Sequence, residues 1–378
     1  MNSSNIFSSL SPFHTILKYT GALIFTIDSR NSTVVVTKWN YFAILLIILS
    51  NALLGCSYWT MDFFFSFTIQ VADKSEPFLI FMDHFICIFT IYWIFRHRHG
   101  VLRILIILNE VDEIYKDNGI DIYHESFRKK TFIATAFCCL YAGSSSTFVA
   151  YIMGLYSTLS GITLALFTIW IYWLSLSFQL HYGFMVFAIS IRCRTMVIWI
   201  QKHPFSLKNI SRIHLRLVEV MKLFNSIFSQ IIMLFIGTLF SWNCFCAFAL
   251  TIARKSTLNE FITSVALLSN LVFSTILLVC VVRYCERILE SKEMMIESLY
   301  FVKNKASKVG CENDEEISGL INQILHTNIR VRCNFFDINW KFLFHFLAAS
   351  IMYLFILIQY EDYLNTRNGA RSSESPFQ

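Results

Sequence analysis

Few polar side chains interrupt the hydrophobic stretches of this chain, and they mark where ligand recognition or ion conduction can occur. They are Asp83, His84, Gln179, His181, Asn243, Asn270 and Gln359. Amide and ionisable groups in such stretches are costly unless they face protein or water, so they indicate function. Gln359 stands out because it lies at the end of a 19-residue apolar run, residues 342–360, just before Glu361 and Asp362.

Motifs for catalysis, nucleotide binding and metal binding are absent from the sequence. It has no Gly-x-x-x-x-Gly-Lys-Ser/Thr loop, no Gly-x-Gly-x-x-Gly, no Gly-x-Ser-x-Gly and no His-Glu-x-x-His. The 11 cysteines are scattered, and Cys244-Phe-Cys246 lacks partners at the spacing of a zinc site. We therefore expect a protein that is not an enzyme and that uses no cofactor, no metal and no nucleic-acid partner.

The composition is typical of a membrane protein. Hydrophobic residues make up 56% of the 378 residues and charged residues 15%, whereas soluble domains carry about 25% charged residues. Seven stretches almost without charge are long enough to cross a bilayer as helices. They are residues 41–59, 78–95, 131–153, 162–188, 231–253, 261–282 and 342–360. The predicted fold is an all-α membrane protein with seven transmembrane helices.

Lys and Arg residues are unevenly shared between alternate connecting segments. The N-terminal tail and segments 96–130, 189–230 and 283–341 carry 26 of them, and the other segments carry 5. Since basic segments remain in the cytoplasm, we predict a cytoplasmic N-terminus and an extracellular C-terminus. A G-protein-coupled receptor has the opposite orientation, which argues against that class. Glycosylation sequons at Asn2 and Asn31 fall on the side predicted to be cytoplasmic, and we give more weight to the charge bias.

The predicted outer loops are short, with 18, 8 and 7 residues, so an extracellular ligand would have to enter between the helices. The last inner segment, residues 283–341, contains two apolar patterns of helical spacing. They are Ile288, Leu289, Met295, Ile296 and Leu299, followed by Ile317, Leu320, Ile321, Ile324, Leu325 and Ile329. Two interpretations fit: either spanning helices extend into the cytoplasm and pack on one another, or the extensions form a platform where copies of the chain meet.

Tyr353 and Gln359 enclose five hydrophobic residues. This pattern resembles the seventh-span signature of insect gustatory receptors: Thr-Tyr, five hydrophobic residues, Gln-Phe. Met352 replaces the threonine and Tyr360 replaces the phenylalanine. The segment Phe335-Phe-Asp-Ile-Asn-Trp340 is similar to the one that leads into that span. Chain length, the number of spans and the predicted orientation agree with the same family.

The resemblance implies a tetrameric, ligand-gated, non-selective cation channel in the plasma membrane of sensory neurons, with the seventh spans around a central pore. It implies that the pore is narrowest at the hydrophobic residue three positions before the glutamine. The pore residues predicted in this way are Tyr353, Ile356, Gln359, Tyr360, Glu361 and Asp362. Ile356 and Gln359 lie about one helical turn apart, so four copies would form a hydrophobic gate beside a ring of amides. The two acids would place negative charge at the outer mouth and favour cation entry.

Aromatic and small polar side chains near the outer ends of spans two to six are candidates for the ligand pocket. They are Phe81, His84, Phe85, Phe148, Tyr151, Tyr156, Trp242 and Asn243. Aromatic walls with few polar groups suit a small organic tastant, and ordinary packing is the alternative for most of these residues. The sugar-sensing branch of the family has Glu where this chain has Leu354. That difference favours a bitter-type receptor or one with a ligand of another kind.

The predicted organisation has three parts. Residues 1–334 form the first six transmembrane helices with the ligand-pocket and anchor regions, residues 335–362 form the pore-lining seventh helix, and residues 363–378 form a short extracellular tail. The expected partners are a small-molecule tastant, membrane lipid, and either further copies of the chain in a homotetramer or other gustatory receptors in a heteromer. Outside this family, a seven-span transporter or a lipid-handling membrane enzyme with a cytoplasmic N-terminus also fits the topology.

Overall fold

A computed structural model describes most of the chain from Gln70 to Ser373 and short pieces before it. The described residues are 6–7, 9–10, 14, 26–28, 33–36, 41–42, 45, 49, 70–120, 122, 124–152, 159–203, 206–252, 258–309 and 314–373. The first predicted span, residues 41–59, and both sequons lie almost wholly outside these ranges.

Long helices make up nearly all of the described part. They are α3 (Gln70–Arg96), α4 (Arg98–Asp117), α5 (His124–Ile152), α6 (Leu159–Lys202), α7 (Leu207–Ile252), α8 (Leu258–Val309), α9 (Asp314–His326) and α10 (Trp340–Ser373). Two small antiparallel ribbons accompany them: β1 (Thr26–Asp28) with β2 (Thr33–Val35), and β3 (Arg332–Cys333) with β4 (Phe336–Asp337). The fold is therefore all-α, as the sequence predicts.

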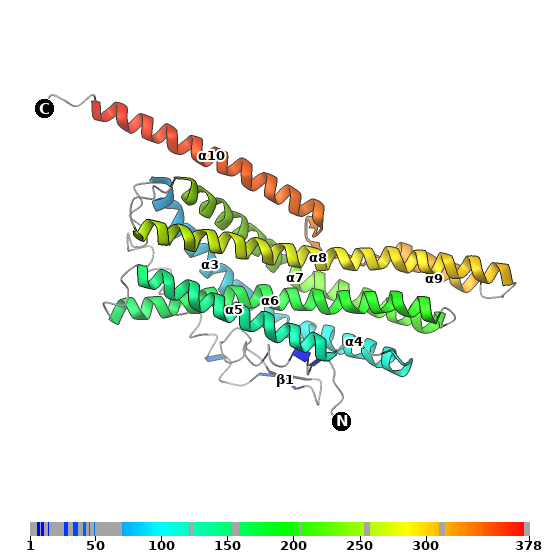
Figure 1. Cartoon of the computed structure of the whole chain (residues 1–378). Coiled ribbons are helices and arrows are strands. Elements are labelled where there is room, and N and C mark those ends of the chain that lie inside the picture. The colour runs from blue at the N-terminus through cyan, green and yellow to red at the C-terminus, as the bar shows by residue number, and fades with distance from the viewer. Residues whose placement is uncertain are drawn as a thin grey trace.

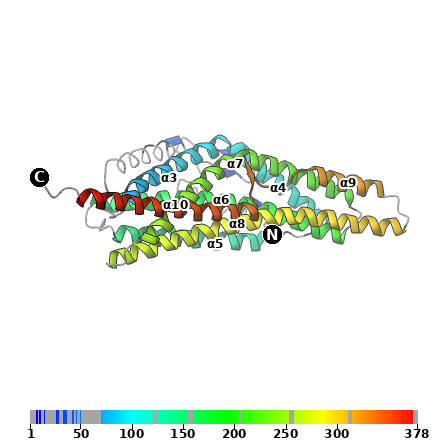
Figure 2. The same ribbon diagram turned by 90° about the horizontal axis from the view of Figure 1, so that it is seen from above.

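The helices lie side by side in one elongated bundle (Figures 1 and 2). α4, α9 and the second half of α8 gather at one end of the bundle, and α10 runs along its edge toward the other end. α8 has 52 residues, which corresponds to about 78 Å and exceeds the roughly 30 Å core of a bilayer. Spanning helices thus continue far beyond the membrane and pack on one another there.

Six of the seven predicted spans coincide with parts of α3, α5, α6, α7, α8 and α10, to within one residue at their ends. Within the described residues, three segments are long and apolar enough to cross a membrane: Trp173–Lys202, Leu207–Thr251 and Trp340–Arg367. The two apolar patterns of the segment 283–341 lie on α8 and around α9, and Ile288, Met295, Ile317 and Ile324 are fully or almost fully buried. The prediction that the spanning helices extend into packed helical segments is confirmed by these helices, and α4 is an additional helix in the segment 96–130.

α4 ends in a left-handed glycine cap. Gly119 has φ 74°, its amide donates to the carbonyl of Lys116, and the amide of Ile120 donates to the carbonyl of Tyr115. This pairing is the Schellman motif, in which glycine is favoured because it has no Cβ to clash at positive φ. The cap stops α4 and turns the chain back toward α5.

A buried ion pair fixes α4 against α6 outside the predicted span 162–188. Nε of Arg192 donates to Oδ1 of Asp112 at 2.8 Å, and its Nη2 contacts Oδ2. Nη1 of Arg192 donates to the carbonyl of Ala188 at 2.7 Å, and the Tyr115 hydroxyl donates to the carbonyl of Arg192 at 2.8 Å. His124 Nε2 lies 3.4 Å from the same carboxylate. Both charges of the pair are buried, so the bidentate geometry is what makes their burial tolerable.

A second polar junction joins α7, α8 and the segment after α9 at Thr327. The Thr327 hydroxyl donates to the carbonyl of Gln323 at 2.7 Å and lies 2.6 Å from Nε2 of His214. Its carbonyl accepts from Nζ of Lys292 at 2.7 Å. Because the hydroxyl hydrogen is used on Gln323, Nε2 of His214 is the donor and its Nδ1 carries no proton. Burial, followed by the charge of Lys292, lowers the pKa of His214 to about 4.

Acidification is expected to weaken this junction. His214 lies on α7 ahead of the predicted span 231–253, and its pKa is about 4 in the folded state against roughly 6.5 when unfolded. The unfolded state therefore binds more protons in this window, so stability is complete above pH 6.5 and falls as the pH drops toward 4, by up to about 3 kcal/mol. The measurement is the thermal unfolding temperature at pH 7.5 and pH 5. The wild type should lose more than His214→Gln, and an equal loss would contradict the prediction.

Candidate functional site

The start of α10 is anchored by polar contacts that precede the predicted pore segment. Asn339 caps the helix, since its side-chain oxygen accepts the amide of Phe342 at 2.8 Å. The carboxylate of Glu286 on α8 accepts the amide of Trp340 at 2.9 Å, as favoured at the positive end of a helix dipole. Asp337 binds Arg330 and Arg332. The Asp-Ile-Asn-Trp pattern noted in the sequence therefore supplies residues that hold the start of this helix in place.

The ribbon β3–β4 is joined to α7 as well. The side chain of Asn225 accepts the amide of Arg332 at 3.0 Å and donates to the carbonyl of Arg330 at 2.8 Å. Ser229 donates its hydroxyl to the side chain of Asn334 at 2.8 Å. Together with the contacts of Asn339 and Glu286, these bonds hold the root of α10 against both α7 and α8.

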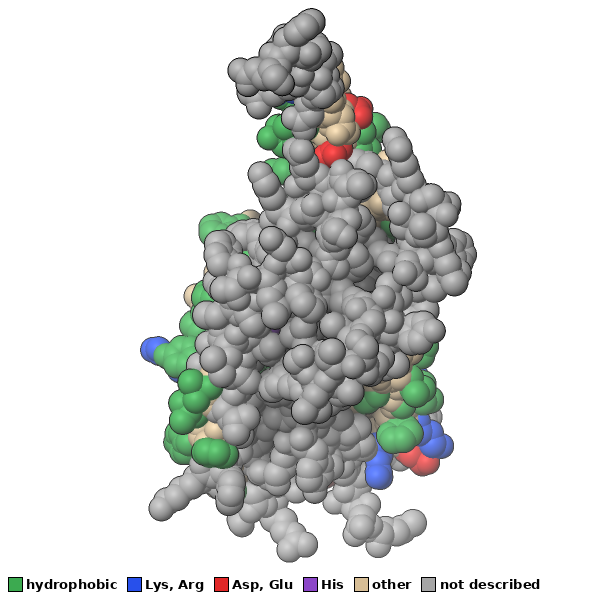
Figure 3. All heavy atoms as spheres, turned by 90° about the vertical axis from the view of Figure 1, so that its left-hand side faces the viewer, with side chains coloured by type: hydrophobic (Ala, Val, Ile, Leu, Met, Phe, Trp, Pro, Cys, Tyr) green, Lys and Arg blue, Asp and Glu red, His purple; other side chains and the backbone are tan. Residues whose placement is uncertain are grey.

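Beyond this root, α10 has one inner and one outer face. Leu343, Phe346, Ser350, Leu354, Leu357 and Glu361 recur at three and four positions and are the less exposed residues. They face α7, α8 and α3. The opposite face exposes large apolar side chains that include Ile351, Met352, Phe355 and Ile356. α10 also stands at the edge of the bundle with acidic side chains near its projecting end (Figure 3).

The predicted pore residues divide between these faces. Ile356 is 54% exposed, and Gln359, Tyr360 and Asp362 are also exposed on the outer face. Tyr353 is half exposed and packs edge-on against Phe240, with ring centroids 5.3 Å apart. Glu361, in contrast, is only 3% exposed and lies on the inner face. Within one chain, therefore, Asp362 is on the exposed face of α10, and Glu361 is turned toward the bundle.

Four of the predicted ligand-pocket residues have described side chains, and two of them, Trp242 and Asn243 on α7, make polar contacts with α3 and α8. The indole nitrogen of Trp242 donates to Asp83 at 2.7 Å, and Ser274 donates to Asn243 at 3.0 Å. His84, next to Asp83, is buried. Phe85 is half exposed. The side chains of Phe81, Phe148, Tyr151 and Tyr156 lie outside the described residues.

The polar contact continues into an apolar cluster that reaches α10. Leu79, Phe245 and Phe248 are buried there, and Trp242 packs against them. Leu354, Leu357 and Ile358 of α10 pack on the same cluster. These α10 residues belong to the hydrophobic stretch between Tyr353 and Gln359, so this cluster connects the candidate ligand region to the candidate pore helix.

Trp242→Phe is expected to weaken this contact without opening a large cavity. The change removes the indole N–H and leaves Asp83 without that donor, which costs about 1–3 kcal/mol for a buried acceptor. The measurement is the thermal unfolding temperature, compared with Trp173→Phe, a buried tryptophan on α6 outside this cluster. A larger loss in Trp173→Phe than in Trp242→Phe would contradict the role assigned to the Asp83 bond.

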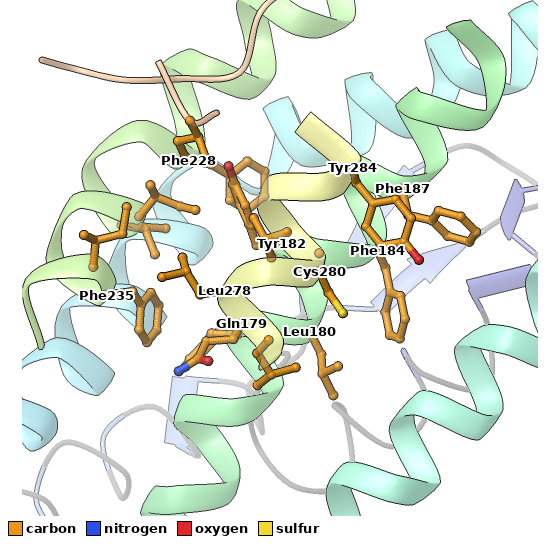
Figure 4. A pocket seen from close by; sticks show the side chains of 18 of the residues that line it. Gln179, Leu180, Tyr182, Phe184, Phe187, Phe228, Phe235, Leu278, Cys280 and Tyr284 are labelled. Carbon is orange, nitrogen blue, oxygen red and sulfur yellow. The ribbon is translucent and has the colours of Figure 1, made fainter. Parts of the chain in front are cut away.

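A separate cavity of about 240 Å³ lies between α5, α6, α7 and α8. Aliphatic and aromatic side chains form its walls, and the aromatic ones gather on both sides of α8, among them Phe184, Phe187, Phe228, Phe235 and Tyr284 (Figure 4). Gln179 and Tyr182 of α6 and Cys280 of α8 add a few polar groups. Its walls are thus largely apolar, as in small-molecule sites.

This cavity lies within the bundle, near the ends of the predicted spans that are predicted to face the cytoplasm. Lys130 and Tyr284 line it and flank the predicted spans 131–153 and 261–282 on that side, and Ile338 lines it just ahead of α10. The four predicted ligand-pocket residues with described side chains do not line it. Gln179, a polar residue inside a predicted span, is the signal in the sequence that points to it. Among the described residues, no group of three His, Cys, Asp or Glu side chains is placed to hold a metal ion.

The long apolar helices, their packed extensions and an exposed edge helix define a multi-span helical membrane protein. A family model described as 7tm Chemosensory receptor matches residues 10–364. The chain therefore belongs to the 7tm chemosensory receptor family. No curated protein matches its sequence.

Solved structures of the insect olfactory receptor OR5 from Machilis hrabei are similar to this chain. One has a TM-score of 0.66 and the other, in complex with eugenol, a TM-score of 0.69. In both comparisons the sequence identity is 14%, with 93% of this chain and 97% of the other covered. At that identity the likeness establishes the fold: the chain has the architecture of these insect receptors.

Proposed function

We propose that the chain is a subunit of a ligand-gated, non-selective cation channel that acts as a gustatory receptor in the plasma membrane of sensory neurons. The observation that carries this proposal is the outer face of α10, where a continuous row of exposed apolar residues contains the amide of Gln359. An intramembrane amide calls for a protein or water neighbour. Assembly of four copies, or of this chain with other gustatory receptors, around the outer faces of α10 would provide both.

In this proposal Ile356 forms the hydrophobic constriction and Gln359 the polar ring above it. Rings of apolar side chains close a pore by dewetting, and polar rings coordinate permeating ions. Asp362 lies beyond them on an exposed part of the helix and would attract cations to the outer mouth.

The ligand is proposed to be a small organic tastant of bitter type or of another non-sugar class. It would bind near the outer contact of Asp83, His84, Trp242 and Asn243, because the apolar cluster below that contact reaches Leu354 and Leu357 of α10. Binding of the ligand would then change the packing of this cluster against α10 directly. The complex of a similar olfactory receptor with eugenol supports a small organic ligand in this fold.

Patch-clamp recording tests the proposal in cells that express the chain, alone and with other gustatory receptors, during application of a tastant panel. We expect a ligand-evoked cation current whose permeability ratios change in Gln359→Ala. Asn322→Ala, which removes an exposed amide on α9, serves as the control and should leave the ratios as in the wild type. A ligand-evoked current whose permeability ratios are unaffected by Gln359→Ala would show that α10 does not line the pore.

Orientation is tested separately with an epitope tag at the C-terminus. The proposal requires antibody staining of intact cells, because the C-terminus is predicted to be extracellular. Staining that appears only after permeabilisation would overturn the orientation, and with it the placement of Asp362 at an outer mouth. A seven-span transporter or lipid-handling enzyme would show substrate uptake or turnover without ligand-gated current.

A further inference from the structure

The cavity between α5, α6, α7 and α8 is open to the surface on its α5 side. Cys280 and Lys130 are both exposed and both line it, so the cavity reaches the outside of the bundle between α5 and α8. Phe184, Phe187 and Cys280 stand together on that side of α8 (Figure 4). Since these helices are predicted to be embedded in lipid at this level, the opening faces acyl chains rather than bulk water.

Its size and walls call for an apolar occupant. An apolar cavity of roughly 150 Å³ is known to remain dry and to bind benzene, and this one has about 240 Å³. Unfilled, its aromatic walls lose dispersion contacts on one side. The cavity is larger than that benzene site, so it can hold part of an acyl chain.

Lys130 lines the cavity, and a second cation, Arg287, lies beside Tyr284, which also lines it. Nζ of Lys130 lies 5.6 Å from the centre of the Phe187 ring, and the guanidinium of Arg287 lies 5.5 Å from the centre of the Tyr284 ring. The two rings are themselves 4.7 Å apart. Among the residues that the structure describes, neither cation takes part in an ion pair, whereas neighbouring Lys129 pairs with Glu125 at 3.1 Å. Both cations thus lie beside aromatic residues that line the cavity, near the predicted level of the lipid headgroups.

We propose that this cavity is a binding site for a long-chain fatty acid that enters from the inner leaflet between α5 and α8. The carboxylate lies at Lys130 and Arg287, and the acyl chain extends along Phe187, Phe184 and Cys280. A neutral aromatic molecule would match the walls but would leave the cations unused. The site is separate from the outer polar contact of Asp83 and Trp242, and it does not depend on which tastant, if any, gates a channel.

Photo-crosslinking of the purified chain in nanodiscs tests the proposal. The probe is a palmitic acid analogue with a diazirine in the chain and a terminal alkyne, and labelled peptides are identified by mass spectrometry. We expect labels within residues 178–187 and 277–284. Gly183→Leu fills the cavity from α6, where a Cβ meets only Cγ2 of Val281 at 3.9 Å, and should reduce labelling about tenfold, equivalent to 1.4 kcal/mol. Gly237→Leu, whose Cβ meets nothing within 4 Å and which is outside the cavity lining, should label as the wild type.

The charge is tested with the matched pair Lys130→Gln and Lys129→Gln. Lys130→Gln should weaken labelling by the acid several-fold and leave labelling by the fatty alcohol of equal length unchanged, and Lys129→Gln should change neither. If Gly183→Leu does not yield folded protein, Ala134→Leu fills the same cavity from α5. Labelling that persists in the filled variants overturns the site, and acid and alcohol probes that label equally well in wild type and Lys130→Gln overturn its selectivity for a carboxylate.

Discussion

Asp112→Ala is expected to destabilise the folded chain by about 3–5 kcal/mol, the typical loss when one partner of a buried ion pair is removed. The change leaves the Arg192 guanidinium buried without a counter-charge. Its contact with the carbonyl of Ala188 cannot compensate, because a carbonyl carries no net charge. We expect a large fall in thermal unfolding temperature of the purified protein and a matching fall in the amount that reaches the cell surface.

Two comparisons isolate the ion pair as the cause. Adding Arg192→Met to Asp112→Ala should recover part of the stability, since an apolar pair of similar volume no longer buries a lone charge. Arg103→Ala breaks the exposed pair of Arg103 with Glu219, at 3.2 Å between α4 and α7, and should cost less than about 1 kcal/mol. A double variant less stable than Asp112→Ala alone would show that packing around Arg192, rather than charge, explains the effect.

Ile356→Ser is expected to produce a cation current without ligand. In the proposed tetramer the substitution replaces the apolar ring with four hydroxyl groups, which allows water and ions to occupy the constriction. Removing a dewetting barrier of about 1.4 kcal/mol or more would raise the resting conductance about tenfold or more. Whole-cell recording in the absence of tastant, normalised to the amount of protein at the surface, measures the effect.

The matched control for this prediction is Ile133→Ser on α5, a residue that is 65% exposed. It introduces the same hydroxyl on an exposed helix face and should leave the resting current unchanged. Equal currents in both variants would show that serine disturbs the membrane domain in general. A silent Ile356→Ser that still responds to ligand would place the gate elsewhere.

The spanning helices were predictable because a long run without charge has few alternatives in a lipid environment. The burial of Ile317, Leu320 and Ile324 was likewise predictable, since helical spacing on a polar background defines a buried face. α4 was not predicted, because charged residues such as Arg103, Glu110 and Asp112 interrupt its apolar residues and it contains no long uncharged run. Its partners, such as Arg192, lie far along the chain.

The candidate site was predictable only where it depends on local geometry. Successive helical residues point about 100° apart, so the adjacent acids Glu361 and Asp362 cannot share a face, and Glu361 follows Leu357 and Leu354 in the inner pattern. The contact between Asp83 and Trp242 joins residues 159 positions apart in the sequence, and the cavity depends on the spacing between four helices. Neither is encoded in the periodicity of any single segment.

The anchored root of α10 restricts how that helix can move. Asn339, Glu286 and the ribbon contacts to Asn225 and Ser229 hold the residues before Trp340 to α7 and α8. The helix therefore has almost no freedom to slide along its axis, because sliding would break all of these bonds together. Its remaining degrees of freedom are rotation and tilt about a pivot at Trp340. A small tilt at this pivot becomes a displacement that grows with distance along α10 (Trp340–Ser373), so Ile356 and Gln359, halfway along the helix, move more than Leu343 near its root.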